Sequence, residues 1–527
     1  FLQQYDLSTQ EGVLLMCIAE ALLRIPDADT ADRLIADKIP SAQWEDHLGE
    51  SDSLFVNAST WGLMLTGQLL SLDEAATSNP AMYLGKLASR AGEPVVRAAM
   101  RQAMRIMGHQ FVMGRTIGEA LERSQKKDGK DYRYSFDMLG EAALTAADAA
   151  RYLESYGAAI DSIAESVDSP ADIFSAPSIS VKLSALHPRY SFTQHARLVK
   201  ELVPRVAELT LQASKGGIAL TIDAEEADRL EISLDIFDRI YRDKRLADYE
   251  GLGLAVQAYQ RRAADVLKFL TESAEAIGRK IPVRLVKGAY WDTEVKLAQE
   301  LGLESYPVFT RKAHTDVSFL ACARMLVDSG DRLYPQFATH NAHTLASILH
   351  FADSRSDFEF QRLHGMGETL YAQIIDPEGF ARPCRVYAPV GSHEDLLPYL
   401  VRRLLENGAN TSFVNRIIDE SIDVKDIVED PIDISHAGKS TPHPRIPSPS
   451  EIFGAGRKNS RGFNLPDRQM TAQLLETMQK ASDEELSAAT IVDGRPVPGK
   501  REPSVNPART KQVVGVCETA DTDAVDR

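Results

Sequence analysis

The sequence predicts an α/β fold, a closed (β/α)8 barrel of the TIM type that is preceded by an all-helical N-terminal region. Between Arg133 and Pro389, eight short apolar segments alternate with stretches of roughly 20 to 50 residues that have helical apolar spacing. Parallel strands need such crossover helices to return to the same edge of a sheet. The segments are Arg133 to Leu139, Ile179 to Leu183, Ile218 to Asp223, Leu252 to Gln257, Ile281 to Lys287, Gln336 to His340, Phe358 to His364 and Cys384 to Tyr387.

Each of the eight segments carries a polar residue at or close to its end. In a (β/α)8 barrel the loops after the strands build the active site, so these residues are expected to meet at one mouth. Any single one could equally be an ordinary strand cap, but eight in register favour a functional mouth. They are Asp137, Lys182, Asp223, Gln257, Arg284 with Lys287, His340, His364 and Tyr387.

The rest of the chain divides around the predicted barrel of residues 131–425. Residues 1–130 are expected to form a helical arm and α-domain. Residues 426–527 contain a proline-rich linker at His436 to Ser450, a helix near Leu465 to Met478, and a strand and turn that open at Pro503. Because the chain of 527 residues begins at Phe1 rather than Met, we expect it to be part of a longer protein.

Composition argues against several classes of protein. The formal net charge of −17 makes general attraction to nucleic acid or to an anionic lipid surface unfavourable. The four cysteines lack metal-ligand spacing, which favours a reduced, cytoplasmic setting. The apolar run from Val13 to Leu23 is too short for a membrane span or a signal peptide. No GxGxxG fingerprint follows a predicted strand, which argues against a Rossmann-type cofactor site.

The motif RLVKGAYWD closes the fifth predicted strand. Strand alternation places Arg284 on one face of the strand and Lys287 on the other. Gly288 allows a ligand to approach the backbone closely, and Tyr290 and Trp291 offer flat surfaces for a ring. The motif could equally be a strand end with snorkelling cations.

A second cationic motif lies on the helix expected at Tyr399 to Gly408. Successive helical residues are ~100° apart, so Arg402 and Arg403 can approach one carboxylate from adjacent directions, and Glu406 can orient them one turn later. A guanidinium fork matches a carboxylate with two parallel hydrogen bonds. A solvated Arg-Arg-x-x-Glu helix face is the alternative, and composition alone favours it.

The acidic run after the third predicted strand has three possible roles. Asp223, followed by Glu225 and Glu226, could bind a metal, act as a base or pair with Lys182, and pairing is the simplest of these. The nearby pair His340 and His343 has no established carboxylate partner, so we expect no metal.

The predicted mouth gathers five cations in a strongly acidic protein, which indicates an anionic ligand. A small carboxylate substrate and a phosphate-bearing cofactor would both satisfy this charge. The five cations are Lys182, Arg284, Lys287, Arg402 and Arg403.

At these residues the chain closely resembles the proline dehydrogenase region of the proline utilization A family, the bifunctional bacterial enzymes of proline catabolism. The resemblance runs from Gln10 through Arg416 and rests on long motifs, which are FDMLGEAAL, SVKLSALHPRY, TIDAEEADRL, RLVKGAYWD, FATHNAHT, LHGMGE and YLVRRLLENGANTSFVNR. It implies an FAD-binding barrel that oxidises L-proline to Δ1-pyrroline-5-carboxylate by hydride transfer from ring C5 to flavin N5.

The resemblance also implies roles for individual residues. Arg402 and Arg403 resemble the clamp for the proline carboxylate, Lys182 a further cationic contact, and Tyr387 the aromatic that packs on the ring. Asp223 resembles a strand-end aspartate near the substrate, and Glu141 a gate that pairs with Arg402. Residues similar to the flavin contacts are Gln257, Arg284, Lys287, Gly288, Tyr290, Trp291, Thr310, Lys312, Thr339, His340, Asn341, Leu363 and Glu406.

The resemblance implies partners as well. Electrons would pass to a membrane quinone through transient peripheral contact with the inner membrane face, and the segment from Pro503 resembles the start of an aldehyde dehydrogenase domain. No aldehyde dehydrogenase activity and no nucleic-acid partner are expected of this chain itself. The alternatives are a barrel lyase or aldolase with Lys182 or Lys287 as a Schiff-base amine, and a non-enzymatic regulatory or scaffold protein.

Overall fold

The computed structural model describes residues 112–126, 129, 131–167, 172–353, 355–391, 423–437, 443–484 and 486–525. The chain divides into two compact units, residues 1–461 and 462–527. The predicted helices of residues 1–111 and of Tyr399 to Gly408 therefore lie outside the described residues.

The first unit contains the predicted barrel. In the described part of the chain eight parallel strands close into a barrel in sequence order. Each of the eight predicted segments overlaps one strand, so the predicted fold class is confirmed. The strands are β1 Arg133–Met138, β2 Ser178–Val181, β3 Ala219–Ile222, β4 Leu252–Gln257, β5 Ile281–Val286, β6 Leu333–Ala338, β7 Glu359–Leu363 and β8 Cys384–Val390.

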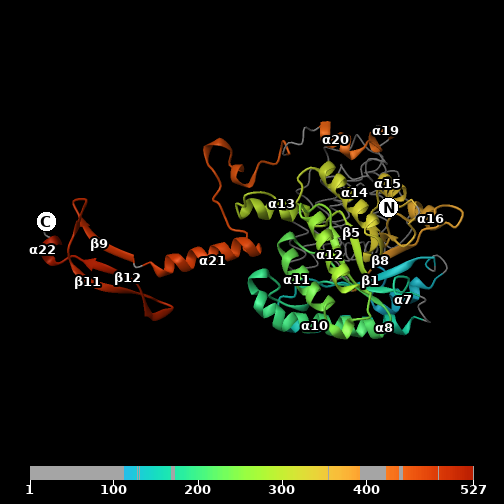
Figure 1. Cartoon of the computed structure of the whole chain (residues 1–527), viewed down its shortest axis with the longest axis horizontal. Coiled ribbons are helices and arrows are strands. Elements are labelled where there is room, and N and C mark those ends of the chain that lie inside the picture. The colour runs from blue at the N-terminus through green and yellow to red at the C-terminus, as the bar shows by residue number, and fades with distance from the viewer. Residues whose placement is uncertain are drawn as a thin grey trace, which may run out of the picture. The chain divides into compact units, whose positions relative to one another are not determined.

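Helices follow the strands and cover the outside of the barrel (Figure 1). Several begin with the expected caps; the Thr145 side chain, for example, forms a capping box with Asp148 at the start of α8. The helices are α7 Ile117–Ser124, α8 Ala146–Glu165, α9 Leu183–Leu186, α10 His195–Lys215, α11 Leu230–Tyr241, α12 Ala263–Ile277, α13 Trp291–Glu300, α14 Lys312–Asp328, α15 Ala342–Ala352, α16 Glu368–Ile375, α19 Val424–Ile427 and α20 Pro431–Ala437.

Two predicted strand bounds differ from the structure by three residues, more than the others. β6 begins at Leu333, three residues before the predicted start, because Pro335 within the strand hides its pattern. β8 continues to Val390, so Tyr387 lies inside the strand and not at its end. Neither difference reverses the alternation of the side chains, which decides what faces the barrel interior.

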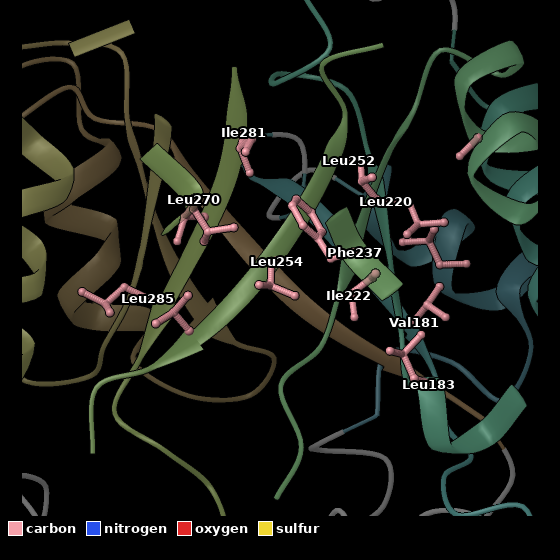
Figure 2. Close-up of a cluster of buried hydrophobic side chains, with 14 of the residues drawn as sticks. Val181, Leu183, Leu220, Ile222, Phe237, Leu252, Leu254, Leu270, Ile281 and Leu285 are labelled. Carbon is pink, nitrogen blue, oxygen red and sulfur yellow. The ribbon is translucent and has the colours of Figure 1, made fainter. Parts of the chain in front are cut away.

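The apolar core is the layer between the barrel strands and the surrounding helices. Figure 2 shows part of it, where Leu254 and Leu285 of the strands lie near Phe237 of α11 and Leu270 of α12. All four side chains are buried. The strands are therefore held from outside by hydrophobic burial, at about 25 cal/mol per Å² of apolar surface removed from water.

The inward faces of the strands are polar instead. Glu359, fully buried on β7, accepts hydrogen bonds from Arg385 Nε at 2.6 Å, Gln336 Nε2 at 2.8 Å and Gln361 Nε2 at 3.0 Å. Arg133 Nη1 donates to its other carboxylate oxygen at 3.1 Å. Barrel interiors usually contain layers of Val, Ile and Leu. Here a hydrogen-bonded ionic network fills the end of the barrel opposite the predicted mouth.

The predicted linker is partly packed. Tyr306 OH donates to the carbonyl of Pro447 at 2.6 Å, and Asn459 Nδ2 donates to the carbonyl of Gln299 on α13 at 2.8 Å. The residues around Pro447 and Asn459 therefore belong to the first compact unit, whereas the predicted boundary lay at residue 425.

The second unit, residues 462–527, has its own sheet. Its strand order is β10-β9-β12-β11, with β9 and β12 parallel and the other pairs antiparallel. The strand and turn predicted from Pro503 are present as β11 and β12. The elements are α21 Arg468–Asp483, β9 Leu486–Val492, β10 Arg495–Val497, β11 Lys500–Asn506, β12 Arg509–Thr519 and α22 Thr522–Val525.

Candidate active site

Five of the predicted mouth residues form one contact cluster at the carboxyl ends of the strands. Lys182 Nζ donates to Asp137 Oδ1 at 2.6 Å and lies 3.4 Å from both Asp223 Oδ2 and the hydroxyl of Tyr387. Tyr387 OH donates to Asp223 Oδ2 at 2.6 Å, and Arg284 Nη1 donates to Asp223 Oδ1 at 2.7 Å. The expected pairing of Asp223 with Lys182 is confirmed.

The cluster balances its charges. Two carboxylates, Asp137 and Asp223, face two cations, Lys182 and Arg284. Burial alone would lower the pKa of Lys182, but Asp137, Tyr387 and Asp223 outweigh burial and raise that pKa well above its ordinary value. Burial raises the pKa of Tyr387, and both aspartates raise it further, so its hydroxyl keeps its proton. Lys182 is thus a fixed cation and Tyr387 a fixed donor.

Arg284 is held on several sides. Its guanidinium donates to Asp223 of the β3 end, to Ser135 Oγ of β1 at 3.0 Å and to Gln361 Oε1 of β7 at 2.7 Å. Its Cζ atom lies 5.1 Å from the centroid of the Tyr387 ring, a cation–π distance. The predicted alternation is confirmed, because Arg284 faces the barrel interior while Lys287 contacts α14.

Lys287 lies outside this cluster. Both Lys287 Nζ and Lys312 Nζ pair with the carboxylate of Asp316 on the first turns of α14, the second at 2.6 Å. Two lysines thus converge at a helix N-terminus, where backbone N–H groups and the helix dipole also favour an anion. Thr310 lies two residues before this helix.

The loop after β5 carries further predicted contacts. Gly288 has φ +145°, and a Cβ atom there would collide with the ring of Tyr259, so the position requires glycine. Trp291 Nε1 donates to the carbonyl of Phe309 at 2.8 Å, and Tyr290 immediately precedes α13. Gln257 connects two loops, since its Nε2 donates to the carbonyl of Glu225 and its Oε1 accepts from Ala289 N.

The ends of β6 and β7 are joined by His340. Its Nε2 accepts a hydrogen bond from Leu363 N at 3.2 Å. Thr339 Oγ1 accepts from Asn341 N at 3.2 Å, and the Asn341 side chain accepts from Thr344 N to cap α15. These four predicted residues therefore share one rim of the barrel mouth.

Some predicted residues are not placed. Arg402, Arg403 and Glu406 lie outside the described residues. Glu141 is described and follows β1, but its expected partner Arg402 is not described, so this pairing stays a prediction. Among the described residues, no group of three or more His, Cys, Asp or Glu side chains could hold a metal ion, and no helix is long and apolar enough to cross a membrane.

The sequence did not single out several residues that complete the cluster. Tyr156 of α8 accepts a hydrogen bond from Lys182 N at 3.2 Å. Asp316 and Gln361 were also missed. The alternating polar residues of β7 were the available signal for Gln361.

Glu294 gives the first testable prediction, because its pKa is raised to about 7 by burial. Its side chain is almost fully buried and accepts a hydrogen bond from Ala227 N at 2.6 Å. Between the unfolded value, near 4.5, and 7, the folded protein binds more protons, so this contribution to stability falls as pH rises. Relative to the wild type, the free energy of unfolding of Glu294→Gln, measured with urea, should rise by about 2 to 3 kcal/mol between pH 5 and pH 8.

Glu300→Gln is the matched control, since Glu300 lies on the same helix but its side chain is exposed. It should show no pH-dependent gain. A Glu294→Gln variant that tracks the wild type at both pH values would contradict the assignment.

Comparison with known proteins decides the family. A family model described as proline dehydrogenase matches residues 120–416, more than half of the chain and all eight barrel strands. The chain belongs to the proline dehydrogenase family. The resemblance drawn from the sequence motifs is confirmed, and residues 120–416 are a proline dehydrogenase domain, an oxidoreductase domain.

Similar curated proteins are longer than this chain. It is 50% identical over 526 residues to the bifunctional protein PutA of Salmonella typhimurium and 49% identical over 531 residues to that of Escherichia coli. Both alignments cover 98% of this chain and 40% of the relative. The chain therefore spans about two fifths of the length of these relatives.

Solved structures agree with the fold. The chain is 47% identical to a structure of proline utilization A (PutA) with proline bound in remote sites, with a TM-score of 0.71 over 93% of this chain and 49% of that one. PutA from Bdellovibrio bacteriovorus inactivated by N-propargylglycine is 25% identical, with a TM-score of 0.74 over 92% of this chain and 53% of that one.

A second family model, described as the DNA-binding domain of proline dehydrogenase, matches residues 1–111. This description runs against the expectation that the chain has no nucleic-acid partner. That expectation used the net charge of the whole chain, which averages over any local basic surface. Residues 1–111 lie outside the described residues.

Proposed function

We propose that this chain catalyses the FAD-dependent oxidation of L-proline to Δ1-pyrroline-5-carboxylate, the first step of proline catabolism to glutamate. The observation that carries the proposal is the cluster of Lys182, Asp137, Asp223, Arg284 and Tyr387 at the mouth of a proline dehydrogenase barrel. The cluster would offer fixed donors and acceptors to a small amino acid.

Recognition of the proline carboxylate needs more than the described cations. Lys182 and Arg284 are already matched by two aspartates, so a carboxylate would meet no net positive charge there. Arg402 and Arg403, which resemble the family's clamp, would supply it, and Glu141 would pair with Arg402. Asp137 Oδ2 is buried and accepts no hydrogen bond from the described residues, which leaves an acceptor for a polar substrate group.

The donor set fits FAD. Lys287 and Lys312 at the start of α14 suit a pyrophosphate, and Gly288, against which the Tyr259 ring packs, would lie beside them after β5. Arg284 would present positive charge to the isoalloxazine. Gln257, Tyr290, Trp291, Thr310, Thr339, His340, Asn341, Leu363 and Glu406 would complete the site. When bound, the flavin supplies N5 as the acceptor of the hydride that leaves C5 of proline.

The chain's own residues would then orient the bound proline and balance its charge. Proline that binds with a neutral amine needs no strong base, because the nitrogen lone pair assists departure of the C5 hydride. Tyr387 keeps its proton and packs its ring against Arg284, so it can fix the pyrrolidine ring without accepting a proton. Orientation in such a site can supply about 7 kcal/mol or more of the barrier.

The wider setting is also proposed. Electrons would pass from the flavin to a membrane quinone, with the protein cytoplasmic and in transient contact with the inner membrane face. The curated relatives are described as bifunctional, which supports an aldehyde dehydrogenase domain in the parent protein. The strand and turn of β11 and β12 would be the start of that domain.

An aldolase with a Schiff-base lysine is disfavoured by the geometry. A nucleophilic lysine needs a lowered pKa, whereas the pKa of Lys182 is raised by two buried carboxylates. Lys287 is paired with Asp316. Lys182 is therefore not poised to lose its proton, and the amine of Lys287 is held in an ion pair.

An anaerobic titration tests the proposed function. The purified chain should show flavin absorption bands that L-proline bleaches in proportion to the flavin present. Pyrrolidine, which lacks the carboxylate, should bleach the same bands far more slowly. A protein without flavin bands, or bands that proline does not bleach, would contradict the proposal.

A further inference from the structure

We propose that Gln361 is a positioning residue for the proposed reaction, because its side-chain amide fixes the orientation of Arg284 from inside the barrel. The inference rests on the proposed function. Gln361 lies on β7 and is 1% exposed, so it is far from solvent. Its Oε1 accepts from Arg284 Nε at 2.7 Å, and its Nε2 donates to Glu359 Oε1 at 3.0 Å.

The two neighbours leave the amide only one orientation. Burial would raise the pKa of Glu359, but Arg385 and Arg133 outweigh burial and lower it, so Glu359 is ionised and can only accept. The amide nitrogen of Gln361 must therefore face Glu359. Arg284 can only donate, so the amide oxygen must face Arg284.

The Nε contact restrains the guanidinium differently from the other two contacts. Asp223 and Ser135 accept from the Nη1 and Nη2 groups, at 2.7 and 3.0 Å. Gln361 accepts from Nε, at the base of the planar group. Three acceptors from three strands thus fix the plane of the guanidinium. Without Gln361, a buried N–H loses its partner, and Arg284 must rotate or shift to recover one.

A chain of hydrogen bonds therefore connects the buried ionic network around Glu359 to the proposed flavin site. Arg385 and Arg133 hold Glu359, Glu359 orients Gln361, and Gln361 orients Arg284. Positive charge held against a flavin stabilises its reduced, anionic form. A displaced Arg284 should make the bound flavin harder to reduce and slow its reduction by proline.

Gln336 provides a matched control on the neighbouring strand. It is also a buried glutamine, and its Nε2 donates to the same oxygen of Glu359 at 2.8 Å. Arg284 bonds Asp223, Ser135 and Gln361, and Gln336 is not among these partners. Gln336→Met removes the same kind of bond from Glu359 as Gln361→Met does, and spares the Nε acceptor.

The experiment compares Gln361→Met and Gln336→Met in the flavin-loaded full chain. Gln361→Met should lower kcat for proline about tenfold, equal to about 1.4 kcal/mol, and lower the flavin reduction potential at unchanged flavin content. Gln336→Met should stay within twofold of the wild type. Gln361→Ala should repeat the loss if the methionine variant does not fold. Equal behaviour of the two variants, or no change in Gln361→Met, would overturn the inference.

A double-mutant cycle on the flavin-free chain separates this inference from the proposed function. The destabilisation caused by Gln361→Met in urea unfolding should shrink in an Arg284→Lys background, which lacks the Nε donor. Additive effects would overturn the positioning role even if the wild-type protein oxidises proline. A wild-type flavin that proline does not bleach would instead contradict the proposed function, and the cycle would still decide the contact.

Discussion

Lys182→Met is expected to lower kcat/KM for proline by roughly 10²- to 10³-fold, at about 3 to 4 kcal/mol for truncating one partner of a buried charge pair. The substitution removes the cation that Asp137 and Asp223 share and leaves two buried carboxylates with one guanidinium. It also removes a proposed contact to the substrate carboxylate. Steady-state kinetics with an artificial electron acceptor would measure the loss at constant flavin content.

A second substitution separates stability from recognition. Asp137→Asn combined with Lys182→Met removes one of the stranded carboxylates, so it should recover most of the thermal stability without recovering proline turnover. Lys200→Met, on the exposed surface of α10, is the control for methionine and should be neutral. If the double variant regained full turnover, Lys182 would act only on folding, and its proposed contact with proline would be wrong.

Glu359→Ala should lower the free energy of unfolding by about 3 to 5 kcal/mol. It strands the guanidinium of Arg385, which is 1% exposed, and removes the ion pair of Arg133. A buried charge without its partner is far more costly than the loss of the pair's own attraction. Urea unfolding followed by far-UV circular dichroism would measure the change.

Asp328→Ala is the comparison for an exposed pair. Asp328 binds Arg324 along α14, and both side chains are more than half exposed, so its loss should cost less than about 1 kcal/mol. Similar losses in the two variants would mean that the interior network contributes no more than a surface pair.

The sequence allowed the fold to be predicted because apolar strands and helical spacing are local patterns. The sequence also predicted that Lys182, Asp223, Arg284 and Tyr387 lie at one mouth, because parallel strands end on the same side of a barrel. The same reasoning missed Asp316 as the partner of Lys287. Asp316 lies on helix α14, so the polar residues at the strand ends give no sign of it.

Long-range pairings set the limit of prediction. Counting cations indicated a positive mouth, but Asp137 and Asp223 neutralise Lys182 and Arg284, and only coordinates show which carboxylate meets which cation. Tyr156 was missed for the same reason, because its hydroxyl contacts the backbone of a residue 26 positions later. The start of β6 was predicted three residues too late, because Pro335 argues locally against a strand.

The ionic interior of the barrel constrains how this family can diverge. An apolar layer accepts exchanges such as Leu for Met one at a time, at small cost. The residues around Glu359 do not, because each single replacement leaves a charge or an amide without its counterpart. Homologous sequences should therefore change Arg133, Gln336, Glu359, Gln361 and Arg385 together or keep all five, whereas the outward-facing residues of the same strands should drift independently.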